Sequence, residues 1–210
     1  CNKNVFCCNY YMRAEKQAMI ILTLSAEKEN TAHDINRWLV KVAQGDMEAF
    51  SYIYENTKTA VYAFLLSYLG CHDAEDAMQD TYIALYKSAD RYKPGSPMSW
   101  IFGIAKNTAL MKLRQNKYDT TLSEEEWSRI ESGSAELTAE DKQVLRQLML
   151  SLSNEEQRII LLHISAGMKF REVSELLCLP LPTVLSKYNR ALKKMKKALK
   201  EESEHGQQNA

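Results

Sequence analysis

The sequence predicts an all-α protein built from two small helical domains, which are joined by an acidic flexible linker. Gly occurs seven times and Pro four times in 210 residues, while the strong helix formers Leu, Ala, Lys and Glu are plentiful. Apolar residues make up 45% of the chain, which is enough for real hydrophobic cores. From Asp34 onward, apolar residues recur with the 3.6-residue period of amphipathic helices, and most runs follow a helix start signal.

The net charge is zero, but the charges are segregated along the chain. Residues 100–118 carry four basic and no acidic side chains, 119–141 carry eight acidic and one basic, and 142–200 carry twelve basic and four acidic. This alternation predicts two basic modules joined by an acidic segment, and we expect the modules to fold independently. The predicted parts are an N-terminal tail (1–33), a first domain (34–118), the linker (119–137), a second domain (138–200) and a C-terminal tail (201–210).

The tail of residues 1–33 shows no sustained period, and it is interpreted as a loose segment or as sequence upstream of a true start at Met12 or Met19. Its longest apolar run, 18–24, is too short to cross a bilayer, so no membrane insertion is expected. The five cysteines have no C-x-x-C spacing and are interpreted as free thiols of a reducing cytoplasm. No phosphate-binding loop, H-E-x-x-H motif or paired ligand spacing is present, so we expect no metal and no cofactor. His72 and His163 are most simply surface or core residues.

In the first domain the patterns predict a short helix at 35–43, a longer one ending near Gly70, one capped by Asp73, and one capped by Ser99 that runs to Asn116. On the third of these, the side opposite the apolar stripe carries acidic and amide groups together with an apolar residue. Those positions are Asp76, Gln79, Asp80, Ile83 and Lys87. An Ile within an acidic face indicates a docking surface, and a solvated surface helix with one exposed Ile is the alternative.

The fourth helix has an apolar back and a basic front. The front carries Gly103, Lys106, Asn107, Leu110, Arg114 and Lys117. Cations bind phosphate and an amide pairs with a base edge, so this face suits a nucleic-acid strand; a solvated basic face is the alternative. The preceding loop, "RYKPGSPMSW", has the aromatic and backbone groups that suit a pocket for an unstacked base.

Thr138 with Asp141 and Ser153 with Glu156 both have capping-box spacing, which predicts that a second helical domain starts near 138. That domain ends in a stretch with the dimensions of a helix-turn-helix, "KFREVSELLCLPLPTVLSKYNRAL". The pattern predicts a helix from Phe170, a turn over 178–181 and a second helix from Pro182, because Pro in a first turn costs no hydrogen bond. On that helix a buried stripe is expected at Val184, Tyr188, Ala191, Met195 and Leu199. The side chains expected to point outward are Ser186, Lys187, Asn189, Arg190, Lys193, Lys196, Lys197 and Lys200. Residues near the helix start read bases, and the later lysines supply salt-sensitive affinity for phosphate.

The stretches "GDMEAFSYIYENTKTAVYAFLLSYLG", "DAEDAMQDTYIALYKSADRY" and "SWIFGIAKNTALMKLR" resemble the first domain of bacterial extracytoplasmic-function (ECF) sigma factors. "LMLSLSNEEQRIILLHISAGMKFREVSELLCLPLPTVLSKYNRALKKMKKAL" is similar to that group's second domain. The resemblance covers about 34–200, in the right order and with a linker between. It implies a cytoplasmic promoter-specificity subunit without catalytic chemistry, which partners with core RNA polymerase, promoter DNA and a cognate anti-sigma factor. The acidic linker is implied to thread through polymerase channels that nucleic acid otherwise uses.

The resemblance also assigns residues to roles. Core polymerase binding is implied for Asp76, Gln79, Asp80 and Ile83. Capture of the melted -10 strand is implied for Tyr92, Trp100, Lys106, Asn107, Arg114 and Lys117. Recognition of the -35 element is implied for Thr183, Leu185, Ser186, Lys187, Asn189, Arg190, Lys193 and Lys197.

The chain departs from the family pattern at several sites. Met111 stands where the family often has Asp, Ser174 where Ala is usual, Cys178 where many helix-turn-helix proteins have Gly, Pro182 where the family has Gly, and Leu185 where it usually has Lys or Arg. One alternative is a helix-turn-helix regulator that does not dock on polymerase, and the acidic face argues against it. A second alternative is an enzyme or thiol sensor that uses Cys7 and Cys8, for which no supporting motif is present.

Overall fold

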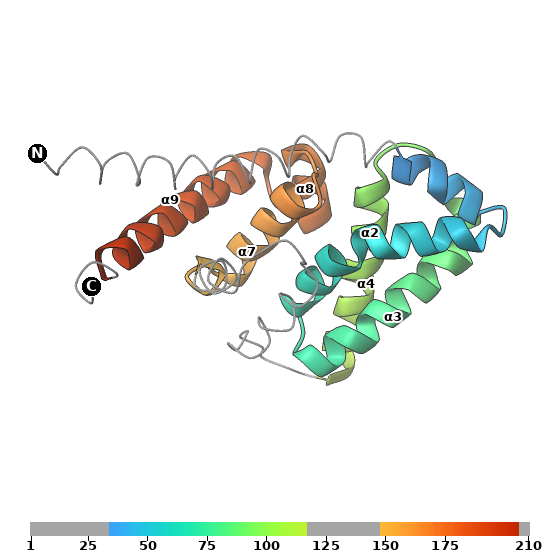
Figure 1. Ribbon diagram of the computed structural model, residues 1–210, viewed down its shortest axis with the longest axis horizontal. Helices are drawn as coiled ribbons and strands as arrows, with labels where there is room; N and C mark the ends of the chain where they lie inside the picture. The colour runs from blue at the N-terminus through green and yellow to red at the C-terminus, as the bar shows by residue number, and fades with distance from the viewer. Residues whose placement is uncertain (1–33, 117–147, 206–210) are drawn as a thin grey trace, which may run out of the picture.

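The computed structural model describes residues 34–116 and 148–205, and within these ranges the secondary structure is helical, with no strand. The first bundle comprises a short helix at 34–42, α2 (Met47–Leu66), α3 (Cys71–Ser88), the one-turn 3₁₀ helix η1 (Ala89–Arg91) and α4 (Pro97–Asn116). The second bundle comprises α7 (Asn154–Ile160), the π-helical turn η2 (Leu161–Ser165), α8 (Phe170–Leu177) and α9 (Leu181–His205). Figure 1 shows the two bundles side by side, with α9 extending away from the first.

The first bundle is held by apolar side chains that follow the predicted helical faces. Leu39, Ile53, Phe64, Leu85 and Ile101 have no exposed surface. In α3 the predicted apolar stripe is buried or half-buried along its whole length, and the acidic side is exposed. The all-α class and the assignment of faces on α3 are therefore confirmed.

Two predicted helix starts in this bundle are wrong by three residues each. The helix α3 begins at Cys71 with Gly70 at the N-cap position, so Asp73 lies in the first turn, where its carboxylate faces the positive end of the helix dipole. The helix α4 begins at Pro97, because Pro at a first helical position loses no hydrogen bond. The Oγ of Ser96 accepts from the backbone N–H of Ser99 at 3.4 Å, so Ser96 takes the capping role predicted for Ser99.

The second bundle confirms the local start signals predicted for it. Ser153 and Glu156 form a capping box at the start of α7. Cys178 ends α8 in the left-handed region, with φ of 56°. Any residue other than Gly, Asn or Asp is uncommon in that conformation, so this is the turn position at which Gly is usual. The next helix, α9, begins at Leu181 with Pro182 in its first turn. Several predictions fall on residues whose structure or side chains are not described. These are the Thr138 capping box, Leu199, Lys200, the linker and both tails.

The two bundles pack against each other in the described part of the chain. Independent folding of each module stays a prediction. α2 contacts η2 and α4 contacts α8, and one buried cluster runs from the first bundle to Ile159, Leu162, Met168, Val173 and Val184 of the second. At its edge, the guanidinium of Arg158 lies 3.5 Å from the centre of the Tyr68 ring.

The same guanidinium also donates two hydrogen bonds to the end of α2. Arg158 Nη2 donates to the carbonyl of Ser67 at 2.5 Å, and Nε donates to Ser67 Oγ at 3.1 Å. Burial lowers the pKa of Arg158 from its ordinary value and raises that of Tyr68. Both side chains are half-buried where the bundles meet.

Candidate protein and nucleic-acid interfaces

The acidic face of α3 is open to solvent over its whole length. Asp76, Gln79 and Asp80 are exposed, and the side chain of Ile83 is 52% exposed. Lys112 reaches this face from α4, with Nζ 3.7 Å from Asp76 Oδ2 and 3.5 Å from Asp80 Oδ2. Lys112 was not predicted here, because the helical wheel puts it among the apolar residues on the back of α4. A basic partner that docks on Asp76 and Asp80 would compete with Lys112 for these carboxylates.

An open apolar hollow lies next to the acidic face, between α2 and α3. It is lined by Met47, Phe50, Tyr82, Ile83, Tyr86 and Lys87. Phe50 packs edge-on against Tyr86, with 5.5 Å between ring centres, and Met47 is 57% exposed. Tyr82, which lines this hollow, is held in place by a hydrogen bond between its hydroxyl and Thr57 Oγ1 at 2.8 Å. Burial raises the pKa of Tyr82 far above its ordinary value. The face can therefore offer a partner both charge and apolar surface.

The loop before α4 is anchored from a distant part of the chain. Tyr92 is buried, its ring centre lies 5.0 Å from that of Trp100, and burial raises its pKa, so its hydroxyl remains a donor at neutral pH. That hydroxyl donates to Asn36 Oδ1 on the first helix. Asn36 also donates from Nδ2 to the carbonyl of Gly95 at 2.9 Å. Sequence reasoning missed Asn36, because an Asn within a helical pattern gives no sign of its partner.

The basic front of α4 is only partly open in this arrangement. Asn107 and Arg114 are exposed, whereas Lys106 is half-buried. Lys106 Nζ donates to the carbonyl of Leu176 at 2.6 Å and lies 3.4 Å from the sulfur of Cys178. Both partners belong to the end of α8 and the turn after it, so the helix-turn-helix covers one cation of the predicted strand-binding face. Lys117, the last of the predicted residues here, lies outside the described part.

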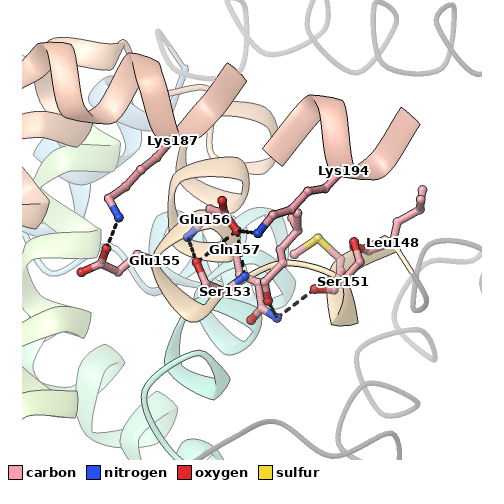
Figure 2. A network of polar contacts seen from close by, with 10 residues as sticks. Leu148, Ser151, Ser153, Glu155, Glu156, Gln157, Lys187 and Lys194 are labelled. Carbon is pink, nitrogen blue, oxygen red and sulfur yellow. Dashed lines mark hydrogen bonds and ion pairs between the residues drawn. The ribbon is translucent and has the colours of Figure 1, made fainter. Parts of the chain in front are cut away.

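The front of α9 presents a mixed surface near its start and cations further along. Leu185 is 37% exposed, Ser186, Asn189, Arg190, Lys193 and Lys197 are exposed, and Thr183 is half-buried. Lys187 was expected to point outward, but it is half-buried and its Nζ lies 2.6 Å from Glu155 Oε2 of α7. Figure 2 shows this ion pair together with that of Lys194 and Glu156, at 2.7 Å. These two pairs tie α9 to α7 and fix the angle at which the exposed residues are presented.

Glu156 is a buried acid held in its charged form. Burial alone would raise its pKa, but hydrogen bonds from Lys194 and Ser153 outweigh that effect and hold the pKa below its ordinary value. The same carboxylate closes the capping box of α7, so one side chain joins the helix start to α9.

Over residues 34–116 and 148–205, no group of three or more His, Cys, Asp or Glu side chains is placed to hold a metal ion. His163 is a packing residue: it stacks on Phe170 with 3.9 Å between ring centres, and Nδ1 lies 2.8 Å from the carbonyl of Met168. Cys178 is a free, exposed thiol, and Cys7 and Cys8 lie outside the described residues. Among the described helices, none is both long and apolar enough to cross a membrane.

An exposed acidic face, a basic helix front and a helix-turn-helix on one helical chain are the features expected of a DNA-binding protein that also binds a protein partner. Two family models match the chain in the same order. Sigma-70 region 2 matches residues 53–118, and Sigma-70 region 4 matches residues 142–195. Together they cover more than half of the chain, so the chain belongs to the sigma-70 family of RNA polymerase sigma factors, which are transcription initiation factors.

The curated relatives narrow the group. The chain is 27% identical over 194 residues to ECF RNA polymerase sigma factor SigK of Mycobacterium sp. (strain KMS), covering 86% of this chain and 98% of that protein. It is 26% identical over 182 residues to ECF RNA polymerase sigma factor SigW of Bacillus subtilis (strain 168), covering 80% and 97%. The chain is thus an ECF sigma factor, as the resemblance predicted, and the regulator that does not dock on polymerase is not favoured.

Two solved structures share the fold. CnrH in complex with the cytosolic domain of CnrY aligns with a TM-score of 0.54 at 20% identity, covering 80% of this chain and 97% of that chain. The sigma factor RpoE in complex with the anti-sigma factor NepR from Bartonella quintana aligns with a TM-score of 0.52 at 21% identity, covering 71% and 97%.

Proposed function

We propose that this sigma factor uses three surfaces, one to bind core polymerase and two to bind promoter DNA. The acidic face of α3, with Asp76, Gln79, Asp80 and Ile83, docks on a basic helical surface of core RNA polymerase. The loop at 92–96 and the front of α4 hold the melted -10 strand, and the exposed front of α9 reads the -35 element. Tyr92 contributes from within the loop, because its ring is buried and its hydroxyl is engaged.

The observation that carries the proposal is the acidic face itself. A helix-turn-helix regulator needs no second surface, whereas α3 keeps three polar groups and Ile83 exposed beside an apolar hollow. Electrostatic complementarity at such a surface accelerates association and fixes the register of docking. The role requires no catalytic group, and it places the protein in the cytoplasm, where core polymerase and promoter DNA are found.

We also propose an anti-sigma factor as a regulatory partner. The support is the likeness to CnrH and RpoE, which were solved in complex with CnrY and NepR, and this likeness is one of fold. The acidic segment 119–137 would connect the two DNA-binding surfaces across the polymerase.

The test is charge reversal on the docking face. Asp76→Arg with Asp80→Arg places two cations beside Lys112 and opposite a basic partner, a repulsion that costs several kcal/mol at an interface. We expect the double variant to remain folded by circular dichroism, to lose core polymerase in a pull-down, and to lose run-off transcription from a genomic promoter pool. Asp90→Arg is the control, because Asp90 is exposed on η1 outside this face. Unchanged polymerase affinity in the double variant would refute the assignment.

A further inference from the structure

We propose that Asn36 is a positioning residue for promoter recognition, because it holds the loop at 92–96 in the shape that the -10 strand meets. The inference rests on the proposed function of that loop, and it adds a residue from the short helix at 34–42 to the site. Asn36 lies 56 residues before Tyr92 in the sequence and does not belong to the loop or to α4.

The side chain of Asn36 uses both atoms of its amide on the loop. Nδ2 donates to the carbonyl of Gly95 at 2.9 Å, and Oδ1 accepts from the N–H of Gly95 at 3.3 Å. Oδ1 also accepts from the hydroxyl of Tyr92. The amide therefore pairs with the backbone of Gly95 as a neighbouring strand would. It also ties Tyr92 and Gly95 to the same point on the helix at 34–42.

Asn suits this position better than other residue types. Asp offers the acceptor but would set a second carboxylate oxygen against the Gly95 carbonyl, and Ala or Leu offers neither donor nor acceptor. The loop needs such an anchor, because Lys93, Pro94 and Gly95 are exposed and apolar burial does not hold its tip. Gly95 is not required for space, since an added Cβ would meet only the Lys93 carbonyl at 3.8 Å.

Trp100 connects the anchored loop to the face of α4 that is proposed to meet the bases. The Tyr92 ring packs on the Trp100 ring in the first turns of α4, and Asn107 lies two turns further on. A loop held by Asn36 presents its aromatic and backbone groups at a fixed distance from Asn107. Holding a site in its bound shape before the ligand arrives improves discrimination, because less order is lost on binding.

The experiment compares variants of the full chain in two assays. The first is the hydrogen-exchange rate of the Gly95 amide by NMR; the second is selection from a promoter pool randomised in the -10 element, with holoenzyme assembled on core polymerase. For Asn36→Ala we expect Gly95 to exchange at least about tenfold faster and discrimination among -10 sequences to fall by roughly five- to tenfold. Polymerase affinity and -35 preference should stay within about twofold, whereas a general loss of folding would lower them too.

Two further variants and a control sharpen the test. Tyr92→Phe keeps the ring and removes one bond to Asn36, so we expect a smaller loss of -10 discrimination, and it decides the matter if Asn36→Ala fails to fold. Asn36→Asp keeps the acceptor and should fall between the parent and Asn36→Ala. Asn56→Ala is the matched control, because Asn56 also donates through Nδ2 to a carbonyl, that of Tyr52, but on the surface of α2.

The outcomes separate the inference from the function on which it rests. Parental -10 discrimination in the folded Asn36→Ala and Tyr92→Phe variants, or an unchanged Gly95 exchange rate, would overturn the role of Asn36 alone. A parent holoenzyme that shows no -10 preference at all would overturn the proposed function of the loop, and the role of Asn36 in promoter recognition would fall with it.

Discussion

Arg158 gives the sharpest prediction about how the two bundles are held together. Its guanidinium stacks on Tyr68 and donates two hydrogen bonds to Ser67, which is itself 2% exposed. A partly desolvated cation–π contact contributes about 1 kcal/mol, and hydrogen bonds from a charged donor contribute a net of about 1.5–3 kcal/mol each. Since contributions of neighbouring contacts do not add, we expect Arg158→Ala to weaken packing between the bundles by about 2–4 kcal/mol.

The size of the loss in packing energy should depend on the paired N–H donors of the guanidinium. Arg158→Lys keeps the charge and loses the paired donors, so we expect about half the effect of Ala. Arg171→Ala is the control, because Arg171 is an exposed arginine on α8, where most substitutions change stability by less than about 0.5 kcal/mol.

Amide hydrogen exchange of the full chain is the measurement. Peptides that cover 65–69 and 161–165 come from the end of α2 and from η2, which are in contact beside Arg158. Both should lose protection together in Arg158→Ala while the cores of α2 and α3 keep theirs. Small-angle scattering should show a larger radius of gyration in the same variant. Equal protection in Arg158→Ala and Arg171→Ala would show that these contacts do not hold the bundles together, and our account of the shared core would be wrong.

Three further predictions concern the same two bundles. Burial raises the pKa of Tyr68, so its contribution to packing is complete below about pH 10 and is lost as pH rises through the folded value; Tyr68→Phe should remove that part of the alkaline decline in a urea-unfolding series. The pKa of Glu156 is lowered, so its contribution to stability is present above the ordinary Glu value and is lost as pH falls through the folded value. Glu156→Gln should flatten the acid decline and cost about 1–3 kcal/mol at pH 7, because the charge that pairs with Lys194 is removed. Lys193→Ala should weaken binding to all duplexes alike and reduce the salt slope by about 0.9, whereas Leu185→Lys should raise general affinity and change the preferred -35 sequence in a binding selection at two salt concentrations.

The features that the sequence predicted well are those determined within one turn or one helix face. Pro182 marks a helix start because its ring fixes φ, and Ser153 with Glu156 forms a capping box because three residues separate them. Cys178 takes the positive φ that the turn requires, although its side chain makes that conformation uncommon. The start of α3 was placed three residues late, since backbone geometry at Gly70 began the helix without a side-chain cap.

The features that the sequence did not predict depend on partners far along the chain. Asn36, Lys112 and Arg158 each lie in an ordinary helical pattern. Their most distant partners along the sequence are Gly95, Asp76 and Ser67, at separations of 59, 36 and 91 residues. A helical wheel gives the direction of a side chain relative to its own axis, but it does not say which helix comes to meet it. The docking face could be drawn from α3 alone, whereas its ion pairs to α4 required the packed fold.

The position of Lys106 links the packing of the bundles to DNA binding. Its ammonium donates to the Leu176 carbonyl at the end of α8, where the helix dipole is negative and a cation is favoured. Under the proposed function, a phosphate of the -10 strand would compete with that carbonyl for the ammonium of Lys106, so strand binding by α4 and the contact between α4 and α8 would draw on one side chain. The -10 and -35 elements are also separated along a promoter, whereas α4 and α8 are in contact here. Under the proposed function, engagement of both elements at once would require the surfaces joined by Arg158 and Lys106 to part, and the contacts that hold them together would then oppose DNA binding by the free protein.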